Sequence, residues 1–125
     1  MLDLNMKILI VDDQQTMRVI VKNVLKDLGF NNFKEAENGQ QAYNLLQKGG
    51  FDFVISDWNM PVMDGLTLVQ QIRRNASFNG IPVLMLSAEK ENDKILAAVK
   101  AGVNNYILKP FTPESLEEKI NIIFA

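Results

Sequence analysis

Short apolar runs alternate along the chain with longer segments whose apolar residues recur at helical spacing. The runs are rich in β-branched and aromatic residues, which favours β-strands. They are Lys7–Val11, Phe33–Ala36, Phe53–Ser56, Val83–Leu86 and Asn105–Leu108. Because strands that alternate with helices build parallel sheets covered on both faces, this pattern predicts an α/β fold.

The segments between the runs predict amphipathic helices, because their apolar residues recur at steps of three and four. In the first helix, the stripe that faces the sheet consists of Met17, Ile20, Val21, Val24, Leu25 and Leu28, and Gly29 follows as a left-handed stop. The second helix begins after a cap at Asn38, contains Ala42, Leu45 and Leu46, and ends before Gly49-Gly50. The third, Gly65–Arg74, contains Leu66, Leu68, Val69 and Ile72, and the fourth, Asp93–Ala101, contains Ile95, Leu96, Ala98 and Val99 ahead of a stop at Gly102. The fifth follows the cap and first-turn proline Thr112-Pro113 and contains Leu116, Ile120 and Ile123. Five strand–helix units joined by right-handed crossovers predict a doubly wound three-layer sandwich.

Length, composition and charge narrow this picture. With 125 residues, of which 47% are hydrophobic and 22% charged, the chain is expected to fold as one domain over residues 1–125, a monomer without an output domain. A net charge of -2 and a basic run no longer than Arg73-Arg74 argue against nucleic-acid binding. Apolar runs such as Val83–Leu86 are too short to span a bilayer, so we expect no membrane association and a cytoplasmic location.

The residue types present restrict the possible chemistry. The chain has no Cys and no His, so thiol nucleophiles, imidazole bases and ordinary zinc sites are excluded. In an open parallel sheet, ligands bind beyond the carboxyl ends of the strands. The polar residues at those ends are Asp12, Asp13, Asp57, Asn59, Ser87 and Lys109. We therefore expect three carboxylates, a hydroxyl and a lysine to converge on one edge of the sheet.

The convergence of carboxylates indicates a metal site. Taken singly, the aspartates could cap helices or form turns, and the serine and lysine could be ordinary surface residues. Two carboxylates about 4 Å apart, however, repel by roughly 4 kcal/mol at an effective dielectric constant of 20 unless a cation accompanies them. Oxygen ligands with room for water suit Mg²⁺. We predict Asp13 and Asp57 as direct ligands and Asp12 as a ligand through water.

A metal ion beside Asp57 would allow its carboxylate to attack a phosphorus atom in line and form an acyl phosphate. The Lys109 ammonium would meet the charge on the transferring oxygens, and the Ser87 hydroxyl would donate a further hydrogen bond. The residues themselves thus predict an aspartyl-phosphate site.

Four segments, KILIVDD, VISDWNMPVMDG, LSAE and YILKPF, resemble the receiver domains of two-component response regulators, and chemotaxis regulators in particular. The resemblance extends from Lys7 to Phe124. It implies a flavodoxin-like fold with strand order 2-1-3-4-5. It also implies that Asp57 is the phosphoacceptor, that Asp12 and Asp13 form an acid pocket, and that the backbone carbonyl of Asn59 is a metal ligand.

The resemblance further implies that Ser87 and Tyr106 form a switch pair, in which the hydroxyl moves towards the phosphoryl group and the ring turns inward. Without it, Tyr106 would be interpreted as a core aromatic. The bond between Lys109 and Pro110 is cis in the family. Chemotaxis regulators more usually carry Thr at the position of Ser87, which retains the hydroxyl. Trp58, next to the acceptor, is expected to be partly exposed and to report Mg²⁺ binding by fluorescence quenching.

The partners are implied by the resemblance alone. The phosphodonor would be the phosphohistidine of a chemotaxis histidine kinase. The surface made by the fourth helix, the fifth strand and the fifth helix would bind the flagellar motor switch protein FliM, and a phosphatase is a further candidate. Such a protein is a signalling switch that catalyses only its own phosphorylation and slow dephosphorylation.

Other functions are weighed against this one. A stand-alone receiver with a different partner would share the same site. Retention of every pocket residue argues against a receiver-shaped interaction module that binds no phosphate. An Mg²⁺-dependent phosphohydrolase usually carries a second Asp two residues after its nucleophile, where this chain has Asn59. A flavodoxin needs a phosphate cradle after the first strand, where the segment DDQQT instead places two negative charges.

Overall fold

A computed structural model describes residues 3–88 and 90–125, which form a five-stranded parallel sheet in the order β2-β1-β3-β4-β5. The strands are β1 (Ile8–Val11), β2 (Phe33–Ala36), β3 (Phe53–Asp57), β4 (Val83–Ser87) and β5 (Asn105–Leu108). The helices are α1 (Gln15–Asp27), α2 (Gly39–Gln47), α3 (Gly65–Arg74), α4 (Asn92–Ala101) and α5 (Pro113–Ile123). The predicted fold class and strand order are confirmed.

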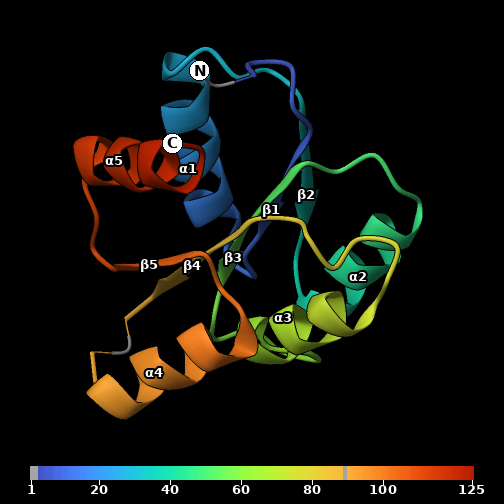
Figure 1. The fold of residues 1–125 in the computed structure, drawn as a ribbon. Coiled ribbons are helices and arrows are strands. Elements are labelled where there is room, and N and C mark those ends of the chain that lie inside the picture. Colours follow the sequence, from blue (N-terminus) through green and yellow to red (C-terminus); the bar gives the residue numbers. More distant parts are fainter. Residues whose placement is uncertain (1–2, 89) are drawn as a thin grey trace.

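The sheet lies between two helical layers, with α1 and α5 on one face and α2, α3 and α4 on the other (Figure 1). Side chains of a strand alternate between the two faces. In β1, Ile8 and Ile10 therefore join the core under α1 and α5, whereas Leu9 and Val11 join the core under the other three helices. Because β1 is buried on both sides, it reads as a continuous apolar run in the sequence.

The helix ends follow from single residues in the sequence. Asn38 caps α2 by accepting a hydrogen bond from the amide of Gln41 (2.8 Å), and Thr112 caps α5 through a reciprocal pair with Ser115. Gly102 ends α4 in the left-handed conformation, at φ 110°. These caps agree with the sequence-based predictions.

Arg73 connects two loops, the one between α3 and β4 and the one between α4 and β5, at the end of the sheet opposite the polar cluster. Its guanidinium donates to the carbonyl oxygen of Gly102 (3.0 and 2.7 Å) and to the side-chain oxygen of Asn104 (3.0 Å). It also donates to the carbonyl oxygens of Asn79 and Ile81, both at 2.7 Å. Burial lowers the pKa of Arg73 from its ordinary value. The end of α3 is thereby joined to the turn between α4 and β5.

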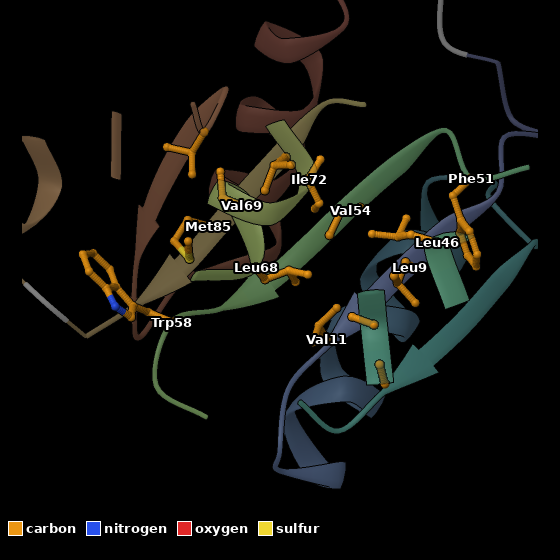
Figure 2. Close-up of a cluster of buried hydrophobic side chains, with 14 of the residues drawn as sticks. Leu9, Val11, Leu46, Phe51, Val54, Trp58, Leu68, Val69, Ile72 and Met85 are labelled. Carbon is orange, nitrogen blue, oxygen red and sulfur yellow. The ribbon is translucent and has the colours of Figure 1, made fainter. Parts of the chain in front are cut away.

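Two expectations about burial are wrong. Ile20 of α1, predicted to face the sheet, is 48% exposed, because α1 meets the core through Val21, Val24 and Leu25. Trp58, predicted to be partly exposed, is only 6% exposed. Figure 2 shows its indole ring at one end of the apolar cluster that also contains Met85 and Leu68.

Amphipathic spacing also overstates the buried face of α4. Its residues Leu96 and Val99 are more than half exposed, and only Ala98 is buried. None of the helices in the described ranges is long and apolar enough to cross a membrane.

Candidate functional site

Three carboxylates converge at the carboxyl edge of the sheet. Asp12 and Asp13 follow β1, and Asp57 is the last residue of β3, the neighbouring strand. One oxygen of each lies within 4.8 Å of an oxygen of the other two. Asp12 and Asp57 are buried, at 2% and 7% exposure, whereas Asp13 is exposed. The parallel topology brings these residues together because strand ends meet at one edge.

Lys109 joins this cluster from the end of β5. Its ammonium lies 3.0 Å from a carboxylate oxygen of Asp57 and 3.4 Å from one of Asp12. The backbone positions it, since the Lys109 amide donates to the carbonyl of Ser87 (2.9 Å). The peptide bond to Pro110 is cis, as the resemblance implied. A cation is thus fixed between two buried carboxylates.

The Asp57 carboxyl has a raised pKa. Burial is the largest cause, because it penalises the charged form, and the negative charge of Asp12 acts in the same direction. The hydrogen bond and positive charge of Lys109 oppose this rise. The net effect is a carboxylate whose charge is poorly compensated, so a further cation at this edge would be stabilising.

The donor set suits a hard divalent cation. The three side chains of the acid cluster offer carboxylate oxygens, and the exposed side of Asp13 leaves room for water. Mg²⁺ binds through one or two carboxylates and keeps several waters, so the residues present fit this ion. The carbonyl oxygen of Asn59 as a further ligand stays a prediction; the residue lies two positions after Asp57 in an exposed part of the loop.

The loop after β3 is tightly constrained. The Gly65 amide donates to the carbonyl of Trp58 (2.8 Å), and a Cβ atom at Gly65 would overlap the carbonyl oxygen of Asp57. Between them, the Met63 amide donates to the carbonyl of Pro61 (2.7 Å) across Val62, which has φ 69° and is 82% exposed. A β-branched residue at positive φ is strained. Such strain beside the carboxylate cluster is typical of functional sites.

The two residues of the predicted switch pair lie on adjacent strands. Ser87 is fully buried at the end of β4, and Tyr106 of β5 is half-buried. The Tyr106 ring meets the Trp58 ring edge-on, with 6.3 Å between their centroids. The aromatic side chain of the pair therefore contacts the residue that directly follows Asp57.

Sequence reasoning missed two residues that shape the site. Arg18 of α1 is buried at 8% exposure and donates to the carbonyl oxygen of Asp12 (2.6 Å). Its signal was its spacing, since Arg18 stands three residues before the core residue Val21 and seven before Leu25, on the inner face of the helix. Gly65 was predicted only as a helix start, and its close approach to Asp57 depends on the path of the loop.

The fold and this edge of the sheet define a class of protein. The family model of the response regulator receiver domain matches residues 8–121, and the chain belongs to this family. The matched range contains the acid cluster, the buried Ser87 and Lys109.

Chemotaxis proteins are among the similar proteins. The chain is 55% identical over 123 residues to chemotaxis protein CheY-3 of Vibrio cholerae, covering 98% of this chain and 95% of the relative. It is 52% identical over 119 residues to CheY of Pseudomonas aeruginosa, covering 95% and 96%. The structure of CheY4 of Vibrio cholerae superposes with a TM-score of 0.88 at 34% identity, covering 95% of this chain and 98% of that one. The chain is therefore a CheY-like receiver domain of the chemotaxis type, as its motifs predicted.

Proposed function

We propose that this chain is a phosphorylation-dependent switch of a chemotaxis pathway, and that Asp57 is the residue that accepts the phosphoryl group. The observation that carries the proposal is the Lys109 ammonium, held 3.0 Å from Asp57 and 3.4 Å from Asp12 within a cluster of three carboxylates. A carboxylate nucleophile, a cation for the transferring oxygens and a set of metal ligands are the groups that aspartyl-phosphate chemistry requires.

The proposed chemistry assigns a task to each side chain. Asp13, Asp57 and the Asn59 carbonyl would hold Mg²⁺ directly and Asp12 through water; the bound ion would neutralise charge on the phosphoryl oxygens. One oxygen of Asp57 attacks the phosphorus atom of a phosphohistidine, forming an O–P bond while the N–P bond breaks and imidazole leaves. The low exposure of Asp57, 7%, would restrict the access of water to the acyl phosphate that results and so slow its hydrolysis.

Lys109 and Ser87 would convert the new phosphoryl group into a conformational change. Moving a two-state protein from 1:99 to 99:1 requires about 5.5 kcal/mol of differential stabilisation. Hydrogen bonds to charged groups contribute roughly 1.5 to 3 kcal/mol each, so contacts from these two residues come close to that amount. Tyr106, whose ring already contacts Trp58, would turn inward as the Ser87 hydroxyl moves towards the phosphoryl group.

A labelling experiment tests the phosphoacceptor. After incubation with acetyl phosphate and Mg²⁺, intact-mass spectrometry of the wild type should show one added phosphoryl group, and Asp57→Asn should show none. Asp52→Asn, which changes an exposed carboxylate outside the cluster, is the matched control and should label normally. Stable labelling of Asp57→Asn, or no labelling of the wild type, would contradict the proposal.

The partners are proposed on the likeness to chemotaxis proteins. A chemotaxis histidine kinase would supply the phosphoryl group in the cytoplasm, and the surface of α4, β5 and α5 would bind the motor switch protein FliM. The exposed apolar residues Leu96, Val99 and Leu108 on that surface support a protein partner. Phosphorylation should lower the dissociation constant for a FliM peptide; an identical titration before and after phosphorylation would indicate a different partner.

A further inference from the structure

Arg18 contacts the acid cluster through the backbone rather than through a carboxylate. The strand pairing of β1 continues as far as the Asp12 amide, which donates to the carbonyl of Ala36 (3.0 Å). The carbonyl oxygen of Asp12, which belongs to the peptide unit between Asp12 and Asp13, accepts a 2.6 Å hydrogen bond from the Arg18 guanidinium. That distance is at the short end for a bond donated by a charged group.

This bond determines how Asp13 is presented. The Asp12 carboxylate is already held by the Gln14 amide (2.9 Å) and by Lys109. The exposed side chain of Asp13, by contrast, depends on the orientation of the peptide unit that precedes it. Since Arg18 fixes the carbonyl of that unit, it also fixes the position of the Asp13 Cα atom, from which the side chain leaves the backbone.

Arg18 is itself held by an ion pair on β2. Its Nε atom lies 3.0 Å from Oε1 of Glu35, and the other oxygen of Glu35 is 2.9 Å from the ammonium of Lys22. Hydrogen bonds from Lys22 and Arg18 lower the pKa of Glu35, so this carboxylate is charged at neutral pH. The Arg18 guanidinium thus spans a charged residue on the edge strand and the backbone of the acid cluster.

We propose that Arg18, oriented by Glu35, is a positioning residue for the metal ligands, which sets the affinity of the acid cluster for Mg²⁺ without touching the ion. This inference rests on the proposed Mg²⁺ site. Groups that orient a metal ligand typically change metal affinity 10- to 100-fold when they are lost. Because Arg18 acts on the backbone of one ligand among several, the expected loss is about 10-fold.

The sign of the effect separates positioning from simple electrostatics. Removing a positive charge near a cation site should tighten Mg²⁺ binding, because it removes repulsion. Positioning predicts the opposite. Arg18→Met should therefore weaken Mg²⁺ binding about 10-fold despite the lost charge, as measured by isothermal titration calorimetry of the unphosphorylated protein.

Two further variants provide the controls. Arg18→Lys keeps the charge but replaces the planar guanidinium, whose Nε and Nη1 atoms donate in two fixed directions to Glu35 and to the Asp12 carbonyl, by a shorter side chain with one nitrogen, so its affinity should also fall, by a smaller factor. Lys22→Met removes a nearby charge whose ammonium bonds to Glu35 and not to Asp12 or Asp13, among the described residues, and its Mg²⁺ affinity should stay within about twofold of the wild type. Circular dichroism checks that each variant is folded, and Arg18→Lys carries the test should Arg18→Met not fold.

The outcomes are distinct. Weaker Mg²⁺ binding in both Arg18 variants, with Lys22→Met unchanged, supports the inference. A second signature is a rise in the Mg²⁺ concentration that gives half-maximal labelling by acetyl phosphate, with the limiting rate at saturating Mg²⁺ unchanged. Unchanged affinity in Arg18→Lys, or tighter binding in Arg18→Met, overturns the positioning role while the Mg²⁺ site stands. A wild type that binds no Mg²⁺ overturns the proposed function, and this inference with it.

Discussion

Replacing Asp57 by Asn should stabilise the protein when Mg²⁺ is absent. The raised pKa of Asp57 means that the folded state disfavours its charged form relative to the unfolded chain. Asn has nearly the same shape and no charge, and its amide oxygen can still accept from Lys109. The substitution therefore removes a charge that costs stability at neutral pH and keeps the packing of the site.

The distances give the size of the effect. At an effective dielectric constant of 20, the Asp12 carboxylate within 4.8 Å repels Asp57 by about 3.5 kcal/mol or more. Asp13 is exposed and screened, so it adds roughly 1 to 2 kcal/mol. The Lys109 ammonium at 3.0 Å attracts Asp57 by about 5.5 kcal/mol. These contributions nearly cancel, so burial decides the sign, and we expect a gain of about 1 to 2 kcal/mol in unfolding free energy.

The pH dependence follows from the raised pKa. Above the folded-state pKa of Asp57, the wild type carries the unfavourable charge, and the advantage of Asp57→Asn is complete. As the pH falls through that value, Asp57 of the folded protein takes up a proton and the advantage shrinks. Below the ordinary value of 3.8, the carboxyl is neutral in both the folded and the unfolded chain, and the advantage disappears.

Urea unfolding in EDTA at several pH values measures this difference, with Asp52→Asn as a control that should stay within about 0.5 kcal/mol of the wild type. Adding Mg²⁺ should reverse the order, because an ion at 100 times its dissociation constant stabilises the wild type by about 2.7 kcal/mol and the variant by less. A variant no more stable than the wild type at pH 7 in EDTA, or an advantage that persists to pH 3, would refute the electrostatic reasoning.

Two further predictions concern stability outside the carboxylate cluster. Val62→Asn should raise the unfolding free energy by about 1 kcal/mol, because Asn tolerates positive φ far better than a β-branched residue. The control Val99→Asn, in α4, should change the unfolding free energy by less than about 0.5 kcal/mol. Equal effects of the two substitutions would argue against strain at Val62. Arg73→Met should lower the unfolding free energy by about 3 kcal/mol, because several acceptors lose a charged donor at once. Arg74→Met, at an exposed position in the same helix turn, should have little effect, and a similar loss in both variants would show that charge rather than the bonds of Arg73 matters.

The architecture was predictable because its signals are local and repeated. Strands buried on both faces appear as unbroken apolar runs, and caps such as Asn38 and Thr112 mark helix starts. The predicted topology was enough to predict the candidate site, because the carboxyl ends of parallel strands place Asp12 and Asp57 at the same edge of the sheet. Strand alternation continued past the end of β3 would also have indicated that Trp58 is buried, since it shares the face of Val54 and both lie in one apolar cluster.

What could not be predicted depends on how elements are set against one another. Arg18 reaches the Asp12 carbonyl only for one rotation of α1 about its axis, and a charged residue in an amphipathic helix is ordinarily placed on the solvent face. The approach of Gly65 to the Asp57 carbonyl depends on the path of a loop in which Val62 has positive φ. That conformation is not expected for a β-branched residue, so the sequence does not predict it. Ile20 shows the reverse error, because apolar spacing cannot distinguish a core contact from an exposed apolar residue.

The uneven anchoring of the helices suggests how a change at the carboxylate edge would reach the surface. The residues of the acid cluster lie at the ends of β1 and β3, which are buried on both faces. Moving Asp12 or Asp57 would therefore disturb buried packing and cost free energy. In contrast, α4 contributes a single buried residue, Ala98, and its end is tied down through the Arg73 contact with Gly102. Local stability follows the number of buried apolar contacts, so a few kcal/mol delivered at the rigid edge should first displace the helix with the fewest buried residues. That helix is α4, and the link between Arg73 and Gly102 gives it a fixed end about which to move.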